Sequence, residues 1–153
     1  MYFVEHRGAD LLNEVVALRV MNESGIDAAQ LQHLLEASKH RQIIMAKAEN
    51  GEPLASLAFA KISKYTLKLL DGNPDHKLRP YEYSEGKILY ILDGFFRRNE
   101  FRKSLKLLLP QLKKYRLIAY VKRGKLRIIY NNKGTIMTCH LAAAESKRNQ
   151  CLC

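Results

Sequence analysis

One carboxylate in this chain stands where a fold could use it for chemistry. Asp93 directly follows the apolar run 88–92, which is short and β-rich enough to be a buried strand. Gly94 comes next and predicts a turn, which places Asp93 at the end of that strand. Strand ends are where α/β folds carry their chemistry, so Asp93 is a candidate to orient or deprotonate a reacting group. The structural alternative is an N-cap for the helix expected after it.

Basic residues crowd the segment that follows Asp93. Residues 97–127 contain a single acid, Glu100, and twelve basic residues. These are Arg97, Arg98, Arg102, Lys103, Lys106, Lys113, Lys114, Arg116, Lys122, Arg123, Lys125 and Arg127. So dense an excess of positive charge would draw an anionic partner toward the end of the strand. The alternative is a solvated helix face with no partner.

Other catalytic motifs are missing from the sequence. A P-loop, a GxGxxG, a GxSxG and an HExxH are all absent, and spacing alone brings none of the five histidines near Asp93; they are His6, His33, His40, His76 and His140. The three cysteines, Cys139, Cys151 and Cys153, form no CxxC pair and their number is odd. We therefore expect neither a disulfide framework nor a bound metal.

The elements that would position these residues follow from hydrophobic periodicity. Helical spacing predicts helices over 10–21, 28–39 with Asp27 as N-cap, 63–70, and from Phe101 through Leu105, Leu108 and Leu112. Apolar runs predict strands over 42–48, 54–62, 88–92, 117–121 and 126–130, with a hairpin turn at Asn50-Gly51. Residues 71–80 are expected to form a long loop, either mobile or functional.

This order of elements predicts an α/β (α+β) sandwich in which helices flank a mixed, antiparallel-leaning sheet. A chain of 153 residues is long enough for one domain with a hydrophobic core. We expect that domain over residues 1–141, followed by a flexible tail over 142–153.

The charge of the whole chain points to acidic or polyanionic partners. The formal net charge is +11, the sequence pI is about 9.7, and the hydrophobic content of 47% excludes wholesale disorder. Nucleic acid is one candidate, although no helix-turn-helix, zinc finger or aromatic RNA-binding motif is recognisable. No apolar stretch approaches the roughly 20 residues of a membrane helix, and the acidic residues Glu5 and Asp10 argue against a secretory signal, which favours a soluble cytoplasmic protein.

Beyond these patterns, the chain resembles the RTX toxin-activating acyltransferases of Gram-negative bacteria. The resemblance runs from about residue 21 to residue 134 and follows pattern and order more than identity. It passes through the segments 52–63, 89–93, 109–120 and 125–130. The resemblance implies a GNAT-like fold and transfer of a fatty acyl group from acyl carrier protein to a lysine of an inactive protoxin, with no bound cofactor.

The resemblance also assigns roles to residues. The aspartate of the family falls on Asp93, and the basic residues after it would dock the acidic donor; these are Arg97, Arg98, Arg102, Lys103 and Lys106. The catalytic histidine of the family falls at Asn22 or a neighbour, where this chain has no histidine. An amide has no lone pair that titrates near neutral pH, so Asn22 cannot replace it as general base.

A branch of the same superfamily fits that departure. The siderophore-microcin maturation proteins resemble toxin-activating acyltransferases and help a second protein to join a glycosylated siderophore to a microcin. The expected partners are thus a toxin or microcin precursor, with acyl carrier protein or a second maturation protein, and a homodimer is a further alternative. Two other functions stay open, a nucleic-acid-binding module and a non-catalytic scaffold for a partner enzyme.

Overall fold

The computed structural model of the chain describes residues 3–5, 8–132 and 135–139. The chain divides into two compact units, one of Met1–Ala60 with Ile91–Leu112 and the other of Lys61–Tyr90 with Lys113–Cys153. Each unit combines strands with helices, and the predicted α/β sandwich with a mixed sheet is confirmed. The predicted extent of one domain over 1–141 stays a prediction, and the predicted tail over 142–153 lies outside the described residues.

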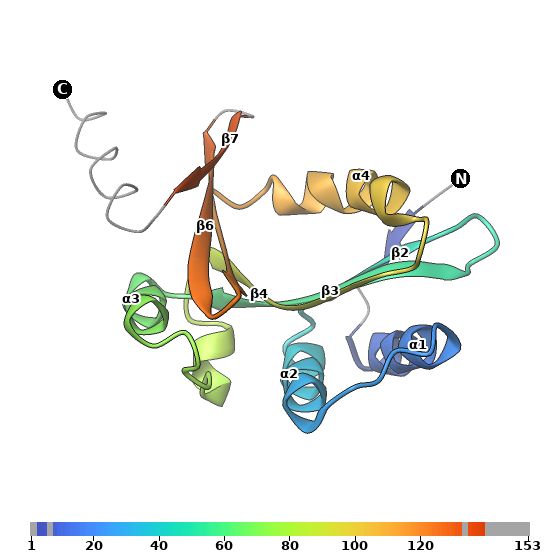
Figure 1. Ribbon diagram of the computed structural model, residues 1–153, viewed down its shortest axis with the longest axis horizontal. Coiled ribbons are helices and arrows are strands. Elements are labelled where there is room, and N and C mark those ends of the chain that lie inside the picture. The colour runs from blue at the N-terminus through green and yellow to red at the C-terminus, as the bar shows by residue number, and fades with distance from the viewer. Residues whose placement is uncertain (1–2, 6–7, 133–134, 140–153) are drawn as a thin grey trace. The chain divides into compact units, whose positions relative to one another are not determined.

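The first unit holds a run of strands between helices. In sheet order its strands are β1 (Phe3–Glu5), β2 (Ile43–Lys47), β3 (Pro53–Ile62) and the end of β4 (Ile88–Phe96). β2 and β3 form the antiparallel hairpin that the turn at Asn50-Gly51 predicted. β2 also pairs antiparallel with β1, a strand that the sequence did not predict. Helices α1 (Gly8–Met21) and α2 (Ala28–Lys39) cover one face of these strands, and α4 (Phe101–Leu112) covers the other (Figure 1).

The core of this unit joins α1 and α2 to the sheet. Its buried residues share helical spacing on the two helices and alternate with neighbours on the strands; they are Leu11, Val15, Leu34, Ala37, Ile43, Met45 and Ala58. β3 is buried along nearly its whole length because helices lie on both faces of the sheet. On α4, Ser104 is fully buried, and its hydroxyl has no hydrogen-bond partner among the described residues.

Both helices under the sheet have defined ends. Asp27 caps α2 as predicted, because its carboxylate accepts from the Gln30 N–H while the Gln30 side chain accepts from the Asp27 N–H. α1 ends in a Schellman motif, in which Ser24 N–H donates to the Arg19 carbonyl over 2.9 Å and Glu23 takes the left-handed position with φ +54°. The last turn of α1 therefore runs from Arg19 to Asn22.

β4 is longer than the sequence predicted. It continues to Phe96, and the Arg97 N–H donates to the Leu54 carbonyl over 2.9 Å, so the turn begins only after that residue. The prediction that Gly94 ends the strand is therefore wrong, and so is the alternative of Asp93 as an N-cap, since α4 begins at Phe101. A Cβ at position 94 would lie 3.3 Å from Cδ1 of Leu57, a tight contact that a small shift of this flexible side chain would relieve.

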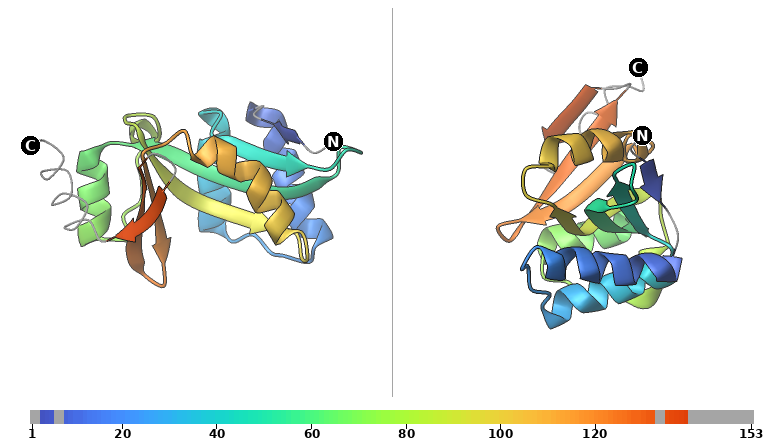
Figure 2. Two further views of the ribbon diagram at one scale, coloured as in Figure 1. Left: turned by 90° about the horizontal axis from the view of Figure 1, so that it is seen from above. Right: turned by 90° about the vertical axis from the view of Figure 1, so that its right-hand side faces the viewer.

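The second unit holds the other strands. It contains α3 (Lys64–Gly72), a 3₁₀ turn (Pro80–Tyr83), the start of β4, β5 (Leu117–Lys122), β6 (Lys125–Asn132) and β7 (Thr135–Cys139). β4, β5, β6 and β7 are neighbours in that order, and β5–β6 and β6–β7 are antiparallel pairs (Figure 2). β4 leads through a helix to β5, the connection that parallel strands need. The predicted loop is shorter than expected, because residues 71 and 72 still belong to α3.

Two residues fix the junction between β3, α3 and the approach to β4. Ser63 caps α3 by accepting from the Thr66 N–H over 3.1 Å. Gly86 passes so close to Ile62 that a Cβ at position 86 would overlap the Ile62 carbonyl, while the Gly86 N–H donates to the Lys61 carbonyl over 2.8 Å.

Within the described part of the chain, no helix is both long and apolar enough to span a bilayer.

Candidate active site

Asp93 is buried, and its partner is a buried arginine. Arg19, in the last turn of α1, donates from Nη2 to Asp93 Oδ2 and forms an ion pair with it. The side chains are only 4% and 8% exposed, so solvent screens this pair little. Because both groups are charged and enclosed, each depends on the other to offset the cost of leaving water.

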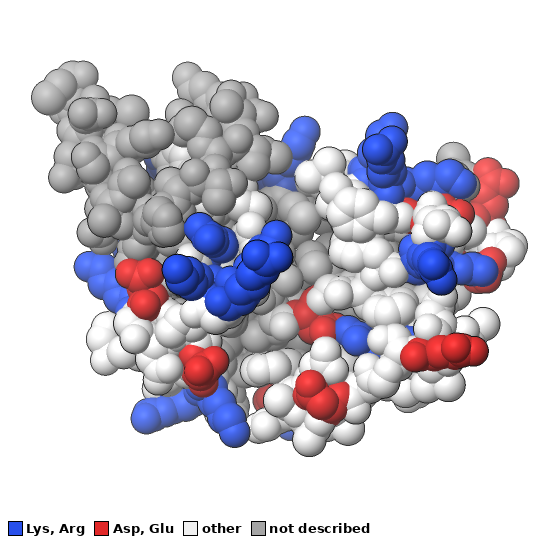
Figure 3. Space-filling view, viewed as in Figure 1, with Lys and Arg blue, Asp and Glu red and all other residues white. Residues whose placement is uncertain are grey.

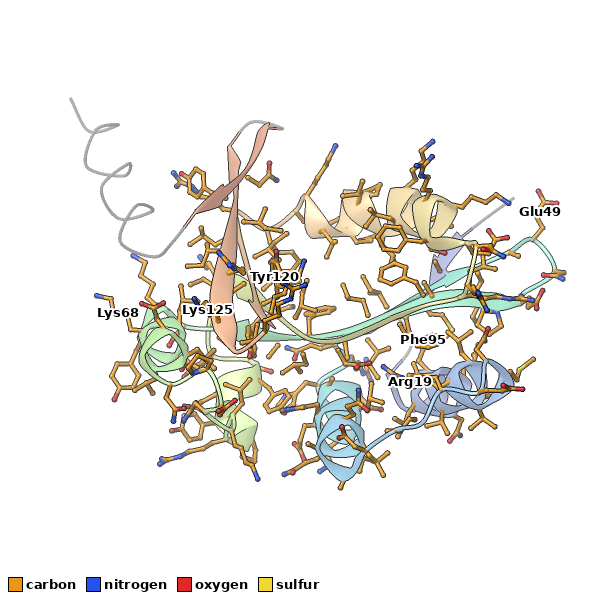
Figure 4. All side chains as sticks on the ribbon, viewed as in Figure 1. Arg19, Glu49, Lys68, Phe95, Tyr120 and Lys125 are labelled. Atoms are coloured by element: carbon orange, nitrogen blue, oxygen red, sulfur yellow. The ribbon has the colours of Figure 1, made fainter. Side chains whose placement is uncertain are left out.

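The arginine has a second contact on the same strand. Its guanidinium carbon lies 5.0 Å from the ring centroid of Phe95, within the range of a cation–π interaction. Figure 4 shows Arg19 rising from α1 toward Phe95 of β4. The Arg19 Nε is buried and has no partner among the described residues, so one donor of the guanidinium remains unused.

Sequence reasoning missed Arg19, although a signal was present. It stands seven residues after Leu12 and four after Val15, on the apolar stripe of α1. A charge on such a stripe needs a buried partner. The identity of that partner could not be read from the sequence, since Asp93 lies 74 positions further along the chain.

Asn22, the residue at or near which the resemblance placed a catalytic histidine, lies one helical turn after Arg19. Residues three apart on a helix are neighbours, so the structure brings Asn22 and the Arg19–Asp93 pair to the same end of α1. The Asn22 side-chain amide donates to the Leu18 carbonyl over 2.7 Å. That bond satisfies one of the carbonyls left open at the end of the helix, which gives Asn22 a structural task.

A small pocket opens beside Asn22. It has a volume of about 60 Å³ and is lined by Leu18, Met21, Asn22, Glu52, Pro53 and Arg97. The pocket can hold a few water molecules or a small polar group, but a fatty acyl chain needs several times this volume. Neither Asp93 nor Arg19 lines this pocket. The pocket wall includes Leu18, the residue that precedes Arg19 in the sequence.

The five basic residues predicted to dock a donor have different surroundings. Arg97 lies at the pocket and forms an ion pair with Glu52. Lys103 lies 3.4 Å from Glu100, one helical turn away on α4. Arg98, Arg102 and Lys106 are exposed and have no acidic partner among the described residues. Arg102, Lys103 and Lys106 share one side of α4, so three of the five form a continuous basic strip.

The described residues offer no metal site and no histidine base for Asp93. No group of three His, Cys, Asp or Glu residues in the described part of the chain could hold a metal ion. His76 lies beside Glu82, with 3.3 Å between Nε2 and Oε2, and belongs to the second unit. His6, His140, Cys151 and Cys153 lie outside the described residues.

Comparison with family models finds no match, and the search of curated proteins finds none either. Solved structures do match. The loading GNATL domain of CurA from Lyngbya majuscula superposes with a TM-score of 0.55 at 14% identity, over 80% of this chain and 65% of that one. The GphF GNAT-like decarboxylase, solved in complex with isobutyryl-CoA, gives the same TM-score and identity over 95% of this chain and 71% of that one.

The fold is GNAT-like. At 14% identity the likeness concerns the arrangement of elements, and the chain spans just under two thirds of the CurA domain. The GNAT-like fold that the resemblance implied is thereby confirmed. What such a fold does in this chain depends on the site, since one fold serves many chemistries.

Proposed function

We propose that this chain is an acyltransferase-like maturation protein that helps to transfer an acyl or ester-linked group onto a toxin or bacteriocin precursor. The observation that carries the proposal is the buried Arg19–Asp93 pair, at the end of α1 and on β4 of a GNAT-like fold. Desolvated charges are costly, and they are often found where a protein positions a reacting group.

In this proposal Asp93 positions the acceptor. Its Oδ2 is held by Arg19, which leaves Oδ1 to accept a hydrogen bond from an acceptor amine or hydroxyl. The acceptor then attacks the carbonyl of the donor thioester, a new C–N or C–O bond forms, the C–S bond breaks, and the acceptor proton ends on the departing thiol. Holding the nucleophile in line is the contribution of Asp93 to the rate.

The donor is expected to be anionic, such as acyl carrier protein. Arg102, Lys103 and Lys106 form the strip on α4 that would bind it, with Arg98 at the preceding turn and Arg97 at the pocket. Charges of this kind raise the rate of encounter more than the final affinity. A protoxin lysine or a microcin serine are the two acceptors that the resemblance offers.

A second candidate is a non-catalytic scaffold for a partner enzyme. The observation that favours it is the Asn22 amide, whose nitrogen is engaged in capping α1 and which cannot act as a base. The two candidates differ in one result, because a scaffold does not perform transfer as a purified chain.

The test is intact-mass analysis of a client coexpressed with the protein, with an RTX protoxin and a siderophore-microcin precursor each tried as the client. Asp93→Asn keeps the size of the side chain but removes its charge, and we expect a loss of modification of at least tenfold. Glu14→Gln is the matched control, because it breaks another α1-to-sheet ion pair, with Lys47 at 2.6 Å, away from the candidate site. Full modification by Asp93→Asn would overturn the proposed role of Asp93.

A further variant separates chemistry from folding. Arg19→Met with Asp93→Leu replaces the buried pair by apolar groups of similar size, which proteins often tolerate. A folded double variant that fails to modify the client supports the proposal. A folded double variant with normal activity would show that the pair serves only the fold.

A further inference from the structure

The hairpin of β5 and β6 carries an unusual face. Its register sets Tyr120 opposite Arg127 and Lys122 opposite Lys125. Directly opposed residues, and residues two apart on one strand, point to the same side of a sheet. These four side chains therefore share one face of the hairpin, and with Arg123 of the turn they line a pocket of about 530 Å³.

The positive charges that line this pocket lie close together and repel one another. Lys122 and Lys125 are directly opposed like charges, an arrangement that destabilises a hairpin. Arg123 adds a third charge from the turn, where its φ is +52°, a conformation that favours Gly or Asn. Within the described part of the chain none of the pocket cations has an acidic partner, and Figure 3 shows Lys and Arg side chains gathered on this face.

The buried face of the hairpin holds the repelling side chains of Lys122 and Lys125 in place. The opposite face is anchored in the protein, since Leu126 is only 7% exposed and Ile128 only 1%. On the charged face, the next rung inward is the apolar pair Ile118 and Ile129. The face thus changes along its length from cationic at the turn, through the aromatic ring of Tyr120, to apolar.

This change from cationic to aromatic side chains along the face fits a ligand that has phosphate groups at one end and a flat ring at the other. Two neighbouring cationic rungs match two neighbouring phosphoryl groups, and lysine and arginine are the usual phosphate-binding side chains. The half-buried ring of Tyr120 lines the pocket beside them and can stack on a flat heterocycle. The volume of about 530 Å³ lies in the range of small-molecule sites. Figure 4 shows Tyr120 and Lys125 at the hairpin, one on each strand.

We propose that this pocket binds a small organic polyphosphate of the nucleoside diphosphate class. Lys122, Lys125 and Arg127 bind the phosphates, with Arg123 at the mouth, and the base lies against Tyr120. The site is separate in composition from Asp93 and from the basic strip of α4. The proposal therefore stands or falls apart from the proposed acyl transfer.

The test is equilibrium titration of the full chain with ADP, inorganic pyrophosphate and adenosine by calorimetry. We expect ADP to bind more tightly than pyrophosphate, and adenosine to give no measurable heat. Lys122→Ala with Lys125→Ala should weaken ADP binding at least tenfold. Tyr120→Leu should weaken ADP binding but leave pyrophosphate binding unchanged.

The matched control is Lys64→Ala with Lys77→Ala, which removes the same charge from exposed positions outside the pocket. Unchanged ADP binding in the control supports a built site, whereas an equal loss would mean simple attraction to net charge and overturn the proposal. Absence of ADP binding at millimolar concentration would overturn it too. So would tight binding of a short single-stranded oligonucleotide that ADP does not displace, since that marks a nucleic-acid surface.

The thermal midpoint of the ligand-free protein gives a further readout. Removing the opposed lysines relieves their repulsion, so Lys122→Ala with Lys125→Ala should be at least as stable as the parent chain. A loss of ADP binding in a variant of undiminished stability cannot be attributed to unfolding. A clear fall in the midpoint would mean that the lysines support the hairpin itself, and would contradict the proposal.

Discussion

The proposed role of the Arg19–Asp93 pair rests on two side chains that the fold also depends on. Breaking a buried ion pair leaves one uncompensated charge, which usually costs more than the pair contributes. A loss of activity after a single substitution at either position therefore has two readings, a missing chemical group or a weakened fold. The stabilities of the single and double variants distinguish them.

We expect Asp93→Ala to lower the free energy of unfolding by about 3 to 5 kcal/mol, because it leaves the Arg19 guanidinium buried without its partner. Arg19→Met with Asp93→Leu should recover most of that loss. Urea denaturation of Arg19→Met, Asp93→Leu and the double variant that combines them measures the coupling. Additive losses in the double variant would show that the two charges do not depend on each other.

Glu85 supplies a second electrostatic element, in the second unit. Burial raises the pKa of Glu85, but hydrogen bonds from the Thr66 hydroxyl and from Ser63 outweigh that effect and hold the pKa below its ordinary value of 4.5. A carboxyl whose pKa is lowered by folding stabilises the protein above its ordinary pKa. That contribution is lost as the pH falls through the folded value.

The expected outcome is a stability difference between the parent chain and Glu85→Gln that depends on pH. The difference should be present at about pH 7 and should shrink as the pH falls through the lowered pKa of Glu85, below which the parent carboxyl is also neutral. Thermal melts of both proteins across this range measure it. A difference that stays constant with pH would mean that the charge of Glu85 is not involved.

At the scale of elements, local signals predicted more than long-range ones. The four predicted helices, the predicted β2–β3 hairpin and the two strands predicted at β5 and β6 are present, because periodicity, caps and turn residues act within a few positions. The predicted end of β4 is wrong, because a glycine favours a turn without requiring one and the strand continues through Gly94 to Phe96. Asp93 was recognised as a candidate, but the ion pair that holds it joins elements far apart in sequence.

Gly86 gives a prediction at this scale. A methyl group there meets the backbone of Ile62, which cannot rotate away as a side chain would, so Gly86→Ala should lower the free energy of unfolding by about 3 kcal/mol. Gly72→Ala is the control, because no atom lies within 4 Å of its added Cβ. Denaturant midpoints compare the two, and equal stabilities would contradict the close approach of Gly86 to Ile62.

At the scale of the whole molecule, the net charge of +11 is expected to attract any polyanion at low salt. This bears on the alternative of a nucleic-acid-binding module. For a DNA duplex of arbitrary sequence held by about four phosphate contacts, affinity should fall roughly a hundredfold between 50 and 200 mM salt. Fluorescence anisotropy at several salt concentrations measures this. Tight, sequence-dependent binding at physiological salt would favour the nucleic-acid alternative.

The enclosed hydroxyl of Ser104 has a practical consequence for work on this protein. An alcohol group without a hydrogen-bond partner weakens the native state, and alanine is the better helix former. Ser104→Ala should therefore raise the unfolding free energy by about 1 kcal/mol and the melting temperature by roughly 3 °C. Such a background would offset part of the stability lost by substitutions at Arg19 and Asp93, so that a folded but inactive variant could be distinguished from an unfolded one.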